Sequence, residues 1–159
     1  MSKSRKELKK IISEMSLEEK ALQLTQCPSY ELDDNLEKIL TGFSRLGSVE
    51  RESLWRLGTV LNVPDAKAAQ SLRKTRKEKG IDDPLPIMLD VIHGYRTIYP
   101  VPVALSCSFD TSLIEDCAEL AATEAKYDGI DVTFSPMVDL TRDARWGRVM
   151  EGGGEDPYW

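Results

Sequence analysis

The sequence predicts an α/β protein built on a parallel β-sheet, and three observations indicate this class. Short runs near residues 58–62, 86–91 and 131–137 are apolar almost throughout, which is typical of strands covered on both faces. Segments with helical spacing of apolar residues, near 65–79 and 111–127, separate these runs. Strands that alternate with helices favour parallel pairing, with the helices packed outside the sheet.

The N-terminal part of the chain is expected to be helical. A first helix has apolar residues at helical spacing, namely Leu8, Ile11, Ile12 and Met15. The stretch SLEE, from Ser16 to Glu19, is a capping box and predicts a second helix. A third short helix, capped by Asp33 or Asp34, is expected to carry the apolar residues Leu36, Ile39, Leu40 and Phe43.

The helix over 65–79 has a start signal and a stop signal. Pro64 opens it, and Gly80 ends it. Its last part, RKTRKEKG (73–80), is basic. Because positive charges stabilise the C-terminal end of a helix, we interpret this run as a solvated helix end rather than a binding patch.

The helix over 111–127 has similar signals, because Asp110 caps it and Gly129 ends it. Before it lies YPVPVALSCSF (99–109), which links the second predicted strand to this helix. Proline is unfavourable inside a helix, so we predict a connecting loop over this stretch.

The predicted strands and helices make up only part of a complete fold. Three strand–helix units leave sheet edges open, whereas a (β/α)8 barrel takes about 250 residues. Asp156 followed by Pro157 has the signature of an N-cap and a first helical residue, so another helix is expected to begin there. We therefore predict that residues 1–159 are the N-terminal portion, about three β/α units, of a (β/α)8 TIM-type barrel in a longer protein.

Composition and charge exclude several classes of function. The net charge is −6, whereas nucleic-acid binding needs a clustered basic face. We find no run of 18 apolar residues and no signal-type segment, so we expect neither membrane insertion nor secretion, and cytoplasmic location is the default. Three cysteines without framework spacing do not indicate a disulfide scaffold.

Polar side chains suited to chemistry follow the second and third predicted strands. They lie in DVIHGYR (90–96), DLTRDARWGR (139–148) and EGGGED (151–156). Functional residues of such folds gather at the C-terminal ends of the strands. His93 is the only histidine, which argues against a zinc site, and the glycines at 152–154 lack the Lys-Ser/Thr of a phosphate loop. The remaining carboxylates, arginines and aromatic side chains suit sugar hydroxyls and the apolar faces of sugars.

These stretches resemble a known family. The segments SLEEKALQLTQ (16–26), PIMLDVIHGYRTIYPVPVALSCSFD (86–110) and GIDVTFSPMVDLTRDARWGRVMEGGGEDPYW (129–159) look like the N-terminal domain of glycoside hydrolase family 3. Its bacterial β-glucosidase branch is the most similar. One departure is Gly153, which lies where the family often has an aromatic residue before the GED motif.

The resemblance implies a barrel as the first domain of a longer enzyme, followed by an α/β sandwich domain. It implies a retaining, exo-acting hydrolase of terminal β-linked sugars, commonly glucose, with no metal and no cofactor. Asp90 matches an aspartate that binds the O4 and O6 hydroxyls of the sugar, and Arg148 matches an arginine that also binds them. The residues expected to shape the surrounding loops are His93, Arg142, Arg145, Trp146 and Glu151.

The resemblance implies no catalytic residue within this chain. A retaining glycosidase uses a nucleophilic carboxylate and an acid/base carboxyl. In the family these come from a later barrel strand and usually from the second domain, with a sugar-contacting Lys-His pair between them. Spacing alone would allow Asp90 and Asp139 as a substitute pair, but neither matches the family's catalytic positions.

Two functions therefore stay open from the sequence. In the first, the chain is the front part of a β-glucosidase-type enzyme and is inactive alone. In the second, it is a non-catalytic sugar-binding or interaction module that completes a barrel with another polypeptide. The expected partner is a β-glucoside or oligosaccharide in either case.

Overall fold

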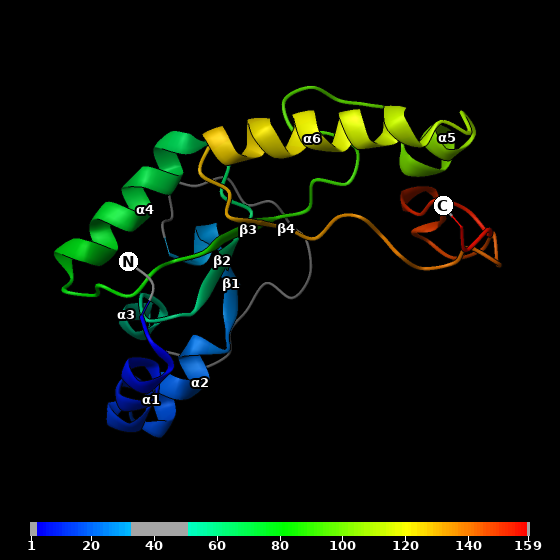
Figure 1. The fold of residues 1–159 in the computed structure, drawn as a ribbon. Helices are drawn as coiled ribbons and strands as arrows, with labels where there is room; N and C mark the ends of the chain where they lie inside the picture. Colours follow the sequence, from blue (N-terminus) through cyan, green and yellow to red (C-terminus); the bar gives the residue numbers. More distant parts are fainter. Residues whose placement is uncertain (1–2, 33–50, 159) are drawn as a thin grey trace.

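The centre of the molecule is a parallel sheet of four strands (Figure 1). The computed structural model describes residues 3–32 and 51–158. The strands are β1 (Gln26–Pro28), β2 (Thr59–Leu61), β3 (Ile87–Leu89) and β4 (Val132–Thr133), in the spatial order β1-β2-β3-β4. Every neighbouring pair is parallel. Strands that follow one another both in sequence and in space, all parallel, are the arrangement with which a (β/α)8 barrel begins.

The three predicted strands are confirmed, each over a shorter span, and the structure adds β1. The sequence analysis missed β1 because QCP is three residues long and contains a proline, so it shows no apolar run. Pairing along β4 stops after Phe134, whose backbone N–H donates to the carbonyl oxygen of Leu89 at 3.3 Å. Pro136 has no N–H to donate and cannot continue the ladder.

The helices are α1 (Arg5–Glu14), α2 (Leu17–Gln23), α3 (Arg51–Leu54), α4 (Ala66–Glu78), α5 (Pro102–Ser106) and α6 (Thr111–Tyr127), with 3-10 turns η1 (Ser29–Glu31) and η2 (Val149–Glu151). The predicted helices α1, α2, α4 and α6 are present, and the structure adds the short helices α3 and α5. The capping box at Ser16 is formed, and Asp65 and Asp110 cap α4 and α6. The predicted helix with Leu36, Ile39, Leu40 and Phe43 lies outside the described residues.

The prediction of a loop over 99–109 is wrong in part, because α5 forms there. Pro102 is the first residue of α5. At this position the missing N–H has no helical partner to lose, and the fixed φ of proline suits the helix. The proline therefore starts the helix instead of preventing it.

The main core lies between one face of the sheet and α4. Cys27, Val60 and Ile87 are paired across β1, β2 and β3, and each side chain is completely buried. Ala69 and Leu72 of α4 belong to the same apolar cluster. Each large side chain buried in this way contributes roughly 1.5–3 kcal/mol to folding. These contacts hold the sheet that positions the loops described below.

The basic run at 73–80 is only in part the solvated helix end that we predicted, because Lys74 and Lys77 are exposed but Arg73 and Arg76 are not. Arg76 is buried, with 2% of its surface exposed, and its Nη1 donates to the carbonyl oxygen of Leu57 at 3.0 Å. Burial lowers the pKa of its guanidinium group. Arg73 donates to the Gly129 carbonyl oxygen at 2.9 Å and to the Asp131 carboxylate at 2.7 Å. The two arginines tie α4 to the segments that precede β2 and β4.

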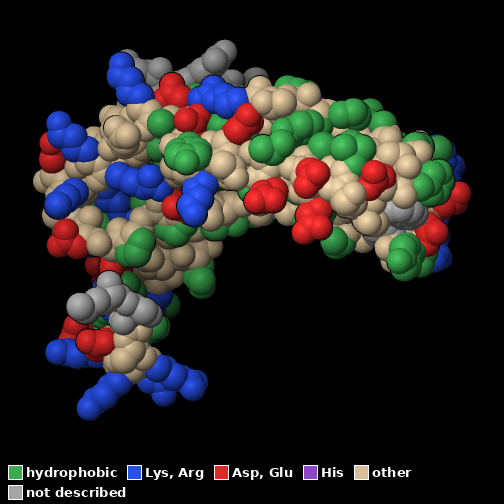
Figure 2. Space-filling model, turned by 45° about the horizontal axis from the view of Figure 1, so that its top comes forward, with side chains coloured by type: hydrophobic (Ala, Val, Ile, Leu, Met, Phe, Trp, Pro, Cys, Tyr) green, Lys and Arg blue, Asp and Glu red, His purple; other side chains and the backbone are tan. Residues whose placement is uncertain are grey.

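The outer side of α6 carries exposed apolar side chains (Figure 2). Leu113 and Leu120 are both exposed, while the buried residues of α6 are the small Ala121 and Ala125. Among the described residues, no helix is long and apolar enough to cross a membrane.

Gly58→Ala is expected to destabilise the fold. A Cβ atom at this position would lie 1.8 Å from the carbonyl oxygen of Gln23, which is backbone and cannot rotate away. We expect the free energy of unfolding to fall by about 1–3 kcal/mol, measured by urea denaturation. Gly147→Ala is the matched control, because its Cβ would meet no atom within 4 Å. Equal stability of the two variants would contradict this close approach.

Candidate functional site

The loops that follow β3 and β4 meet at one end of the molecule. Asp90 comes directly after β3, and its side chain is exposed. The segment after β4 runs toward α5, and η2 contacts α5 at that end (Figure 1). This is the end at which the C-terminal edges of parallel strands point, as expected for a site in this fold.

Arg148 and Glu151 form a bidentate ion pair in this region. Arg148 Nε donates to both carboxylate oxygens of Glu151 at 3.1 and 3.0 Å, and Nη2 donates to Oε2 at 2.6 Å. These hydrogen bonds raise the pKa of Arg148 and lower the pKa of Glu151. The negative charges of Asp90 and Asp139 also help to raise the pKa of Arg148. The charge of Asp90 thus acts on Arg148.

The loop that carries Arg148 folds back on the segment after β4. Met137 and Gly152 form a parallel bridge, and the Thr141 N–H donates to the Gly154 carbonyl oxygen at 2.9 Å. A Cβ atom on Gly152 would lie 3.2 Å from the Asp139 carbonyl oxygen, so a larger side chain would push the two segments apart. Gly152 therefore allows close backbone packing, whereas a Cβ on Gly154 would meet no atom within 4 Å.

The other predicted site residues differ in their contacts and in their exposure. His93 is half-buried, its Nδ1 lies 3.2 Å from the Tyr99 carbonyl oxygen, and it contributes to the lowered pKa of Glu151. Arg145 is paired instead with Asp143, and 90% of its side chain is exposed. Trp146 is half-buried, and its backbone N–H donates to the Asp143 carbonyl oxygen at 3.1 Å. Arg142 is exposed.

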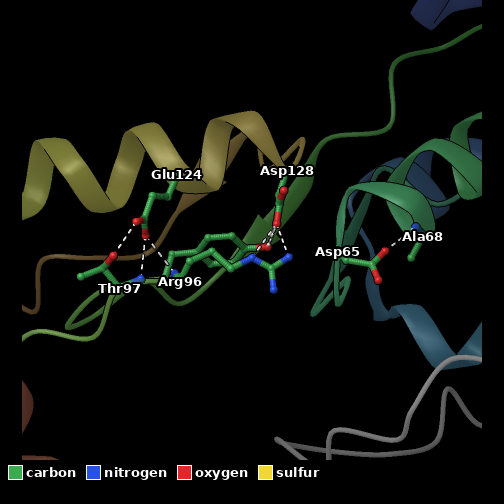
Figure 3. A network of polar contacts seen from close by, with 7 residues as sticks. Asp65, Ala68, Arg96, Thr97, Glu124 and Asp128 are labelled. Atoms are coloured by element: carbon green, nitrogen blue, oxygen red, sulfur yellow. Dashed lines mark hydrogen bonds and ion pairs between the residues drawn. The ribbon is translucent and has the colours of Figure 1, made fainter.

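Sequence reasoning missed a set of polar contacts between α6 and the loop after β3. Glu124 and Asp128 of α6 accept hydrogen bonds from residues 95–97 (Figure 3). Nothing in the local sequence links these carboxylates to the GYRT stretch. In residues 3–32 and 51–158, no three His, Cys, Asp or Glu side chains are grouped so that they could hold a metal ion.

The chain matches a known protein family. The family model described as "Glycosyl hydrolase family 3 N terminal domain" matches residues 16–159. The chain belongs to glycosyl hydrolase family 3.

Individual relatives of this family 3 chain are glycosidases. A periplasmic β-glucosidase from Salmonella typhimurium is 45% identical over 75 residues, which are 47% of this chain and 10% of that protein. A β-xylosidase from Formosa agariphila is 31% identical over 155 residues, which are 96% of this chain and 16% of the relative. The chain thus spans a sixth or less of these two relatives.

Solved structures show the same fold. The β-glucosidase from Listeria innocua, in complex with isofagomine, matches with a TM-score of 0.86 and 39% identity, over 98% of this chain and 21% of that one. A β-glucosidase involved in saponin metabolism from intestinal bacteria matches with a TM-score of 0.68 and 29% identity. The family 3 chain therefore has the fold of the N-terminal part of these enzymes.

Proposed function

We propose that the chain is the first part of a β-glucosidase-type hydrolase and supplies some of its sugar-binding groups. The observation that carries the proposal is the common location of Asp90 and Arg148. Asp90 follows β3, Arg148 lies in the loop after β4, and the charge of Asp90 acts on Arg148. In this proposal both side chains bind hydroxyl groups of the terminal sugar.

The chemistry of the two groups supports this role. A carboxylate accepts hydrogen bonds from two neighbouring hydroxyls, and such charge-assisted bonds are stronger than neutral ones. Glu151 occupies Nε and Nη2 of Arg148, so within the described residues Nη1 is the nitrogen available to a ligand. Glu151 also keeps Arg148 oriented, because its two oxygens engage two nitrogens of the same guanidinium group.

We infer that the sugar is a glucoside rather than a xyloside. The Listeria innocua enzyme has been crystallised with glucose, laminaribiose and isofagomine, whereas the Formosa agariphila relative is named a β-xylosidase. The role proposed for Asp90 includes the hydroxyl on C6, which a xyloside lacks. The cytoplasmic location stays a prediction, and the Salmonella relative is named a periplasmic enzyme.

The chain alone is expected to hydrolyse no aryl β-glucoside. A retaining mechanism needs two carboxyl groups about 5 Å apart, and we place both outside residues 1–159. The test is a chimera in which residues 1–159 replace the aligned segment of the Listeria innocua β-glucosidase. We expect the chimera, but not the chain, to release p-nitrophenol from p-nitrophenyl β-glucoside, and to act more slowly on the β-xyloside.

Other results of the chimera experiment would distinguish the β-glucosidase-type enzyme from the non-catalytic binding module. A folded chimera with no activity and no affinity for glucose would overturn the proposed site. Affinity for glucose without turnover in the chimera would favour the non-catalytic binding module instead. Turnover by the purified chain, lost in Asp90→Asn, would make Asp90 a catalytic residue.

A further inference from the structure

The loop after β3 is closed on itself at residues 93–99. The Tyr99 N–H donates to the His93 carbonyl oxygen at 2.8 Å, and Gly94 and Ile98 form an antiparallel bridge. Gly94 has φ of 114°, and a Cβ there would lie 2.0 Å from the Thr97 carbonyl oxygen. The loop is therefore a compact unit, and a contact at its tip affects its base at His93.

Glu124 of α6 binds the tip of this loop. Its carboxylate accepts hydrogen bonds from the backbone N–H groups of Arg96 and Thr97, both at 2.9 Å, and from the Thr97 hydroxyl at 2.7 Å (Figure 3). A single side chain thus satisfies two backbone donors of the loop. The bonds from Thr97 lower the pKa of Glu124, so the carboxylate stays ionised at neutral pH.

Asp128, one helical turn further along α6, binds the same loop through side chains. It accepts hydrogen bonds from the Tyr95 hydroxyl at 2.8 Å and from Arg96 Nε at 2.9 Å, and it pairs with Arg96 Nη2. Arg96 also lies over the Tyr95 ring, 5.0 Å from its centroid. Burial and the bond to Asp128 raise the pKa of Tyr95 to about 12, so the phenol remains a donor.

The base of the loop faces the candidate sugar site. His93 contributes to the lowered pKa of Glu151, which in turn orients Arg148. Asp90 precedes this loop by only a few residues along the chain. A shift of the loop would consequently change the position of both Asp90 and His93 relative to Arg148 and Glu151.

We propose that Glu124 and Asp128 are positioning residues that hold residues 95–97 against α6 and so fix Asp90 and His93 beside the Arg148–Glu151 pair. This inference rests on the sugar site proposed above. Neither carboxylate contacts the sugar in this arrangement. Their effect on binding is transmitted through the closed loop.

The test compares Glu124→Gln with Glu119→Gln in the chain and in the chimera. Glutamine keeps the shape of Glu124 but loses its charge, which weakens the bonds that the Arg96 and Thr97 N–H groups make to one carboxylate oxygen, and it replaces the oxygen that accepts from the Thr97 hydroxyl by an NH2 group. Glu119 is an exposed carboxylate on the same helix and is the matched control. In the chain, the Arg96 and Thr97 amides of Glu124→Gln are expected to exchange hydrogen at least tenfold faster than in the control.

In the chimera, Glu124→Gln is expected to lower kcat/KM and the affinity for isofagomine by about tenfold to a hundredfold, because displacements near 1 Å have effects of this size. Measurements are made well below the melting temperature, so that a loss of folded protein does not contribute. Glu124→Ala should lower kcat/KM and the affinity for isofagomine more than Glu124→Gln does, because alanine has no acceptor atom in its side chain. Tyr95→Phe removes one hydrogen bond to Asp128. It is expected to lower kcat/KM and the affinity for isofagomine less than Glu124→Gln does.

The outcomes distinguish this inference from the proposed function. An active chimera whose kcat/KM and isofagomine affinity are unchanged by Glu124→Gln would overturn the positioning role alone, even if the amides exchange faster. A folded but inactive chimera without substitutions would overturn the sugar site, and the positioning role with it.

Discussion

Asp90→Asn is expected to lower kcat/KM of the chimera by about a hundredfold or more, which corresponds to at least 2.7 kcal/mol. Asparagine keeps the shape and one acceptor oxygen but loses the charge. Each charge-assisted hydrogen bond contributes roughly 1.5–3 kcal/mol, and part of this is realised only in the transition state, when the sugar ring flattens. Because Asp90 is exposed, the substitution should leave folding unchanged.

The control for Asp90→Asn is Lys74→Gln on α4. Its side chain is 78% exposed, and within the described part of the chain its one ion-pair partner is Glu78 of the same helix. Arg73 would be a poor choice, because it binds Gly129 and Asp131. If Asp90→Asn retained the activity of this control while remaining folded, Asp90 would have a structural role, and the sugar would bind elsewhere.

Arg148→Lys is expected to lower kcat/KM of the chimera by about tenfold to a hundredfold. Lysine keeps the positive charge, but a point charge cannot bond both oxygens of Glu151 and still direct a nitrogen toward the sugar. Glu151 would then lose the partner that lowers its pKa. Steady-state kinetics on p-nitrophenyl β-glucoside measure the effect.

The matched control is Arg56→Lys, an identical substitution at an exposed ion pair with Glu19. Ion pairs of this type contribute about 1 kcal/mol or less, so activity should stay near that of the unsubstituted chimera. If Arg148→Lys behaved like Arg56→Lys, the planar guanidinium group would have no special role, and Arg148 would act through charge alone.

Features that depend on neighbouring residues could be predicted from the local sequence. The side chains that cap α2 and α6 bond to backbone groups two or three residues away, so Ser16 and Asp110 could be recognised from local spacing. The start of α4 was predicted at Pro64, whereas its cap is Asp65. The strands β2, β3 and β4 were predicted from continuous apolar runs, which are typical of strands buried on both faces. Both residues of β4, however, are exposed in the structure. The placement of Asp90 and Arg148 at one end of the sheet followed from the parallel order of these strands.

Features that depend on distant residues are visible only in the folded protein. β1 is too short to show a pattern, and it is a strand because β2 lies beside it. Arg76 lies on the buried side of α4, four residues after Leu72, and its hydrogen-bond acceptor is the carbonyl oxygen of Leu57, which is distant in sequence. Glu124 meets Thr97 across 27 residues of chain, and no spacing rule links two such positions. These contacts form only when folding brings separate elements together, so no short stretch of sequence predicts them.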